Sequence, residues 1–180
     1  MSKRIKILDG GMATSLEEKG FDLTGNLWSA KILLDNPEAI RTVHYEHASA
    51  GADIITTASY QASRSGFRKS GYSESDYLRA LEMSVILAQS VADQVESRQE
   101  RAIEVAASVG PYGAILADGS EYRGDYDVSE EFLIDFHGNR LRDIEQLEPN
   151  LLAFETIPSI SELRAINHLL NKDFRHLPAW

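Results

Sequence analysis

Four short runs of the chain are apolar at nearly every position, and they recur at roughly regular intervals. Aliphatic and β-branched residues dominate these runs, which is typical of strands buried on both faces. The first run leads into Asp9, and its isoleucines and leucine predict a short buried strand. The predicted strands are 5–8, 53–57, 102–109 and 151–155.

Between these runs the apolar residues change to a helical spacing. Asn36–Pro37 predicts a helix start, because proline is tolerated at the first helical position, where no amide donor is needed. Two helix caps are predicted in which a serine side chain accepts a hydrogen bond from the backbone amide three residues later. They are Ser73 with Asp76 and Ser159 with Glu162. The predicted helices are 36–51, 73–95, 129–147 and 159–170.

Strand and helix alternate four times, which predicts an α/β fold with a parallel sheet covered by helices. Two architectures fit this order: an open doubly wound sheet, or part of a (β/α)8 barrel. Polar residues recur at the carboxyl ends of the predicted strands, and in a barrel they would all face one mouth. These residues are Asp9, Thr56, Thr57, Ser108 and Glu155.

The composition excludes several classes of partner. The 180 residues carry a formal net charge of -10, and such a surface repels phosphate backbones and acidic membranes, so we expect neither nucleic acid nor a membrane as partner. No run approaches the ~18 apolar residues of a membrane span, and there is no apolar core of a secretory signal, so we expect a cytoplasmic protein. The absence of cysteine excludes disulfides and thiolate metal sites within these residues.

Asp9 and Glu155 are the leading candidates for a functional site. They close the first and fourth predicted strands, and Gly10 and Gly11 allow the backbone after Asp9 to turn and approach a ligand closely. Two carboxylates at one mouth can hold an ammonium group, bind a metal, or act as acid and base. The alternative is that each carboxylate only accepts hydrogen bonds from a helix start.

The five histidines give a weaker signal. His44 and His47 are spaced like neighbours on a helix, and a packed or half-exposed pair is expected rather than a zinc pair. The other three, His137, His168 and His176, fall in helical or tail segments away from the strand ends. We therefore predict that they are surface residues.

Several stretches together resemble one family, the homocysteine S-methyltransferases, and especially the bacterial branch that uses S-methylmethionine or S-adenosylmethionine. The similarity runs from Ile5 to about Leu170, and its most specific part lies between Gly110 and Tyr126. The stretches are LDGGMAT at 8–14, AGADIITT at 50–57, YQAS at 60–63, SVGPYGA at 108–114, LADGSEYRGDY at 116–126 and FETIP at 154–158.

The resemblance implies a zinc-dependent (β/α)8 barrel that transfers a methyl group from a sulfonium donor to the thiol of homocysteine, which yields methionine. It implies that Asp9 and Glu155 hold the amino group of homocysteine. It also implies that Thr57 and the backbone of Gly10 and Gly11 help to position the amino acid.

Zinc in the family is held by three cysteines in the carboxyl-terminal half of the barrel, and the metal lowers the pKa of the thiol. This chain has no cysteine and ends at Trp180, where a fifth strand would be starting. We therefore expect one domain over 1–180 that forms about four βα units, the amino-terminal half of the barrel. It would contain no catalytic residue and no zinc ligand, and it would be inactive in methyl transfer on its own.

Two other functions remain open on the residues alone. One is a carboxylate-based hydrolase or lyase of the barrel type that uses Asp9 and Glu155 as acid and base. The other is a non-catalytic module that binds an amino acid or forms homo-oligomers, since four βα units leave two sheet edges and apolar surface uncovered.

Overall fold

A computed structural model describes residues 5–23, 27 and 29–180 of the chain. Three parallel strands form its sheet in the order β1 (Ile54–Thr56), β2 (Glu104–Val109) and β3 (Leu151–Phe154). Ile54 pairs with Glu104, and Ala106 pairs with Leu151. The prediction of an α/β fold with a parallel sheet is confirmed.

One further segment pairs at each edge of this sheet. Leu8 forms a parallel bridge with Ile54, and the Asp9 amide donates to the Ile54 oxygen at 3.0 Å. At the opposite edge Ala179 forms a parallel bridge with Leu152, where the sequence predicted the start of a fifth strand. Five parallel segments therefore follow one another in chain order, as in consecutive units of a (β/α)8 barrel.

The prediction that the first of these segments is a buried strand is wrong. The residues before Asp9 make one bridge rather than a regular strand, and Ile5 and Ile7 are 85% and 58% exposed. Among the described residues, β1 is the one sheet neighbour of this segment, so its apolar side chains lack the cover that burial requires. An apolar run therefore predicted the pairing correctly and the burial incorrectly.

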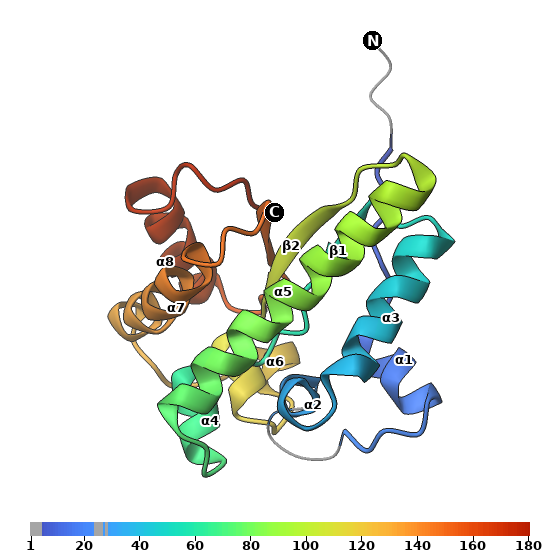
Figure 1. Ribbon diagram of the computed structural model, residues 1–180. Coiled ribbons are helices and arrows are strands. Elements are labelled where there is room, and N and C mark those ends of the chain that lie inside the picture. The colour runs from blue at the N-terminus through green and yellow to red at the C-terminus, as the bar shows by residue number, and fades with distance from the viewer. Residues whose placement is uncertain (1–4, 24–26, 28) are drawn as a thin grey trace.

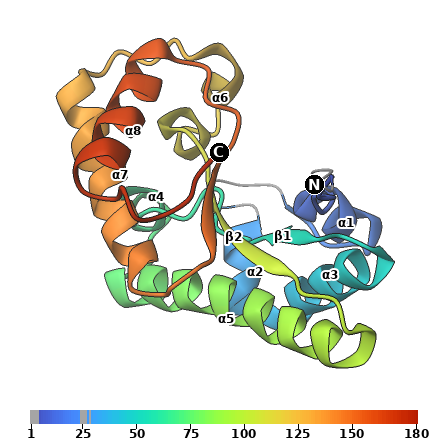
Figure 2. The same ribbon diagram turned by 90° about the horizontal axis from the view of Figure 1, so that it is seen from above.

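The helices lie outside the sheet (Figures 1 and 2). The long α5 runs along one face, with α3 beside it, while α7 and α8 pack together at the far end. The helices are α1 (Met12–Glu18), α2 (Ser29–Asp35), α3 (Pro37–Ala50), α4 (Arg64–Lys69), α5 (Glu74–Gln99), α6 (Ser120–Arg123), α7 (Glu130–Glu145) and α8 (Ile160–Lys172), with a 3-10 turn η1 (Tyr112–Ile115).

The predicted helix caps have mixed outcomes. Ser73 and Asp76 form the reciprocal capping box at the start of α5. Ser159 accepts the Glu162 amide at the start of α8, but the Glu162 side chain bonds elsewhere, so this cap is one-sided. Asn36 makes no side-chain cap bond, although α3 does begin at Pro37.

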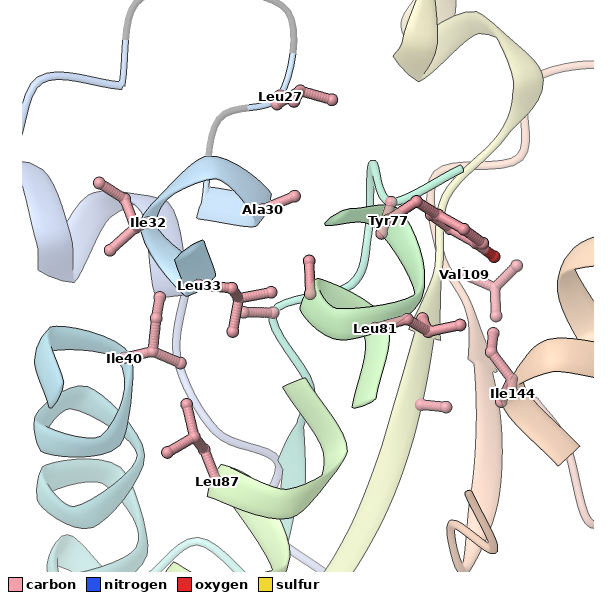
Figure 3. Packing of buried hydrophobic residues seen from close by; sticks show 14 of the residues in the cluster. Leu27, Ala30, Ile32, Leu33, Ile40, Tyr77, Leu81, Leu87, Val109 and Ile144 are labelled. Carbon is pink, nitrogen blue, oxygen red and sulfur yellow. The ribbon is translucent and has the colours of Figure 1, made fainter. Parts of the chain in front are cut away.

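The main hydrophobic core lies between the helices and the sheet (Figure 3). Leu33 of α2, Ile40 of α3 and Leu81 of α5 are each at most 1% exposed and meet in one cluster, which extends to Val109 at the end of β2. Burying one such side chain contributes roughly 1.5–3 kcal/mol. This core fixes the sheet from which the loops of the site project.

The placement of His137 on the surface was wrong. Its side chain is fully buried, and Nε2 lies 2.7 Å from the Glu162 carboxylate. His137 falls on the same face of α7 as Leu133, Leu141 and Ile144, all of which are buried. His168 is exposed and His176 largely so, as predicted.

No helix in the described ranges is long and apolar enough to cross a membrane.

Candidate amino-acid-binding site

A cavity of about 300 Å³ opens at the carboxyl ends of the strands, and the predicted site residues line it together. Asp9 reaches it from the end of the first segment, and Glu155 reaches it from the end of β3. Gly10, Gly11 and Thr57 complete the predicted set in its wall. Thr56 and Ser108, which the sequence analysis placed among the polar strand ends, also line it. Further lining residues that the sequence did not point to include Tyr60, Gln61, Tyr122 and Thr156.

Asp9 is held in place by the end of β1. The Thr56 amide donates to Oδ2 of Asp9 at 2.8 Å, and the Thr56 hydroxyl donates to both carboxylate oxygens at 3.1 and 3.2 Å. The pKa of Asp9 is raised from 3.8 to about 6, mainly by burial and to a smaller extent by the nearby charge of Glu155, although the bonds from Thr56 act to lower it. The two carboxylates therefore interact across the cavity, and a cation between them would relieve their repulsion.

Glu155 is oriented by β2. The Ser108 hydroxyl donates to Oε2 of Glu155 at 2.8 Å, and the Glu155 amide donates to the Val109 oxygen at 3.2 Å. Ser108 was recognised as a polar strand end, but its bond to Glu155 depends on the register of β2 with β3. That register cannot be obtained from the strand pattern alone.

Thr56, the last residue of β1, and Thr57, which follows it, have different surroundings. Thr57 lines the cavity, but its hydroxyl lies 2.6 Å from the Ser59 hydroxyl and accepts the Ser108 amide at 3.0 Å. Thr56 is the residue that bonds Asp9; the sequence analysis placed it among the polar strand ends, but the family resemblance pointed to Thr57 instead. The alternation of side chains along a strand shows only that one of the two must face inward.

Close packing against His47, rather than a positive φ, explains why residue 10 is a glycine. A Cβ on Gly10 would lie 3.1 Å from Nε2 of His47, and one on Gly11 would lie 3.3 Å from the Thr14 hydroxyl. His47 also lies 3.2 Å from the Ser15 hydroxyl. The turn after Asp9 is therefore packed closely against α3 on one side while its other side borders the cavity.

A family model, "Homocysteine S-methyltransferase", matches residues 6–180. The chain belongs to the homocysteine S-methyltransferase family. It is 48% identical to the homocysteine S-methyltransferase YbgG of Bacillus subtilis over 97% of this chain and 56% of that protein. It is 47% identical to the homocysteine S-methyltransferase of Escherichia coli over 92% of this chain and 54% of that protein.

The structural comparison agrees with the sequence comparison. The metallated form of the homocysteine methyltransferase MmuM from Escherichia coli superposes with a TM-score of 0.91 at 44% identity, over 99% of this chain and 62% of that one. The present chain spans about half the length of the relatives it matches. It corresponds to the amino-terminal part of the fold, which agrees with the expectation of a partial barrel.

The donor groups of this chain do not fit the zinc site that the family resemblance implies. The sequence has no cysteine, and the described residues contain no group of three or more His, Cys, Asp or Glu side chains able to hold a metal ion. His44 is fully buried and His47 is half-buried, as expected for a packed or half-exposed histidine pair. We therefore assign no step to a metal held by these residues.

The cavity can bind a small molecule with a positively charged end, because two carboxylates line it and two hydroxyls orient them. Oxygen acceptors at two sides of the cavity match the three donors of a primary ammonium group. The raised pKa of Asp9 is also a feature of acid–base sites, so the geometry by itself leaves the hydrolase hypothesis open.

Proposed function

We propose that this chain supplies the homocysteine-binding part of a homocysteine S-methyltransferase. Asp9 and Glu155 would grip the ammonium group, and the turn at Gly10 and Gly11 together with Thr57 would surround the remainder of the amino acid. The single observation that carries this proposal is the convergence of both carboxylates on one cavity from strand ends that are far apart in the chain.

The methyl donor would be S-methylmethionine or S-adenosylmethionine, and the product methionine. In the family the homocysteine thiol would be activated by a zinc ion held by cysteines, and this chain has no cysteine. We therefore expect the 180-residue chain alone to bind homocysteine without forming methionine. Methionine formation by the pure chain, measured with either donor, would refute this part of the proposal.

Homocysteine binding is tested by isothermal titration of the 180-residue chain and its variants. Asp9→Asn and Glu155→Gln keep the size of each side chain but remove one charge-assisted partner of the ammonium, which contributes roughly 1.5–3 kcal/mol, or about tenfold to a hundredfold in Kd. Glu17→Gln makes the same chemical change at an exposed position of α1 and should bind like the parent chain.

A ligand series separates this function from a general acidic cavity. 4-Mercaptobutanoate has the thiol and carboxylate of homocysteine but no amino group, so it should bind more weakly to the parent chain and should lose nothing in Glu155→Gln. Equal affinity of the parent chain for both ligands would contradict the ammonium grip. Turnover of a glycoside by the parent chain that Glu155→Gln abolishes would favour the hydrolase hypothesis instead.

The remaining expectations stay predictions. The exposed Ile5, Ile7 and Leu8 at one sheet edge favour association through that edge, which light scattering would detect. The formal net charge of -10 disfavours nucleic-acid partners. A cytoplasmic location is proposed from the metabolic role of the family.

A further inference from the structure

A second cavity, of about 390 Å³, lies between α4, the start of α5 and α7. Figure 2 shows the end of α7 beside α4 and the first turns of α5. Among the described residues, the wall of this cavity has no member in common with the wall of the amino-acid-binding cavity. On α7 the wall is formed by residues three or four apart, which share one face of a helix. They are Phe132, Asp135, Phe136, Asn139 and Arg140.

The charge of this cavity is opposite to that of the whole chain. The chain has 28 acidic and 18 basic residues, whereas the described wall of the cavity contains three arginines and one carboxylate, Asp135. Arg64 is already paired, because its guanidinium donates to the two oxygens of Asp143 at 2.6 and 3.1 Å and also contacts Glu74. The other two arginines are therefore the ones available to a ligand.

Arg140 is a buried cation without a counter-ion. It is 2% exposed, and its partners among the described residues are the backbone oxygens of Ser59, Tyr60 and Gly110, at 2.6 to 2.9 Å. Its Nε has no hydrogen-bond partner in the same part of the chain. Burial lowers the pKa of Arg140 to about 10, so the guanidinium is still charged at neutral pH. Carbonyl oxygens satisfy its donors but do not neutralise its charge, and an uncompensated buried charge costs free energy. An anion in the cavity would supply the missing negative charge.

Two groups on α4 add donors that are not used within the described structure. Arg68 is exposed and has neither an ion pair nor a hydrogen bond to another described residue. The hydroxyl of Ser65 is buried and also lacks a described partner. Both residues line the cavity, and guanidinium and hydroxyl groups are donors that suit carboxylate or phosphate oxygens. The rings of Phe132 and Phe136 add aromatic surface on α7, against which a flat apolar group can pack.

We propose that this cavity is a second binding site, for a small organic anion: a carboxylate or phosphate group binds beside Arg68, Ser65 and Arg140, and a flat apolar body packs on Phe132 and Phe136. The proposal does not depend on homocysteine binding, because the two cavities have separate walls.

Phenyl phosphate and inorganic phosphate test the anion site when each is titrated into the 180-residue chain and followed by amide NMR. Both should shift the amide signals of residues 65 and 68, and phenyl phosphate should bind more tightly because its ring packs on α7. Arg68→Gln removes one charged donor and should raise the Kd of both probes about tenfold. Arg175→Gln makes the same change at an exposed position after α8 and should alter neither Kd. An unchanged Kd in Arg68→Gln would overturn the proposal, and so would shifts confined to the residues around Asp9.

Phe132→Ala tests the apolar part of the site. Phe132 is 43% exposed, so its removal should leave the chain folded. The Kd of phenyl phosphate should rise severalfold in this variant, while the Kd of inorganic phosphate should stay unchanged. Equal binding of phenyl phosphate by the variant and the parent chain would overturn the assignment of a flat apolar body.

Benzoate distinguishes the two kinds of anion, since it carries a carboxylate on the same ring. Tighter binding of benzoate than of phenyl phosphate would support a carboxylate ligand, and the reverse would support a phosphate ester. If none of the three probes shifts residues 65 and 68 at millimolar concentration, the second site is refuted, whereas homocysteine binding at Asp9 and Glu155 is judged by its own titration.

Discussion

His44 makes the stability of this chain sensitive to mild acid. The imidazole is fully buried on α3, neither ring nitrogen has a hydrogen-bond partner, and burial lowers its pKa from 6.5 to about 3. An unfolded chain takes up a proton on His44 below pH 6.5, whereas the folded chain does not until about pH 3. Stability is therefore lost as the pH falls from 7 toward 3.

The size of the effect follows from the pKa difference. At pH 5, which lies about 1.5 units below the pKa of His44 in the unfolded chain, protonation of His44 stabilises the unfolded chain but not the folded one. This difference lowers the free energy of unfolding by about 2 kcal/mol. Such a loss is a large fraction of the roughly 5–15 kcal/mol by which a domain is stable. His137 is buried with its pKa lowered to about 3 as well and adds a loss of the same sign.

The assay is urea unfolding at pH 7 and pH 5 for the parent chain and His44→Leu. Because His44 has no hydrogen bond to lose, the leucine variant should be at least as stable at pH 7 and should lose about 2 kcal/mol less than the parent chain between the two pH values. Asp9 and Glu162, whose pKa values are raised, act with the opposite sign, but they are common to both proteins.

His168→Leu is the matched control, since His168 is exposed on α8. It should show the pH dependence of the parent chain. Equal losses in His44→Leu and the parent chain would refute the assignment to His44.

Two further predictions concern the site and its supports. Asp9 becomes neutral below its pKa of about 6, so the affinity for homocysteine should fall as the pH drops from 7 to 5. If titration calorimetry finds a constant affinity, the binding of the ammonium group by a charged Asp9 is contradicted. Glu162 accepts from the Tyr112 amide at 2.6 Å, from Tyr126 and from His137, so Glu162→Ala leaves one buried and two partly buried donors without their acceptor and should cost about 3 kcal/mol in urea unfolding. Glu82→Ala, at an exposed position of α5, should cost less than ~1 kcal/mol, and a similar small cost at Glu162 would contradict this role.

The larger elements of the fold could be predicted because each has its own periodicity. The β-branched run of β1 and the helical spacing in α5 are local patterns, and the structure confirms both within a few residues. The short helices α1, α4 and α6 were missed. Each has at most seven residues, which is too short to show a helical period, and α6 is held by its packing on η1.

The site was predictable to the extent that strand ends determine it. Asp9 and Glu155 follow apolar runs, and parallel strands bring their carboxyl ends to one edge. The bond from Thr56 to Asp9 was not predicted, because it joins the end of β1 to the neighbouring segment and depends on how the two pair. His137 was misplaced for a related reason: its partner Glu162 lies on another helix, and only the packing of α7 against α8 brings them together.

The most direct test of the amino-acid grip is the pKa of Asp9 with and without homocysteine. The carboxyl carbon of Asp9 can be followed by NMR as the pH is changed, and the free chain should titrate near 6. An ammonium group held beside Asp9 and Glu155 favours the charged carboxylate, so saturating homocysteine should lower this pKa, by about one unit or more. A pKa of Asp9 that stays the same in bound and free chain would contradict the central claim.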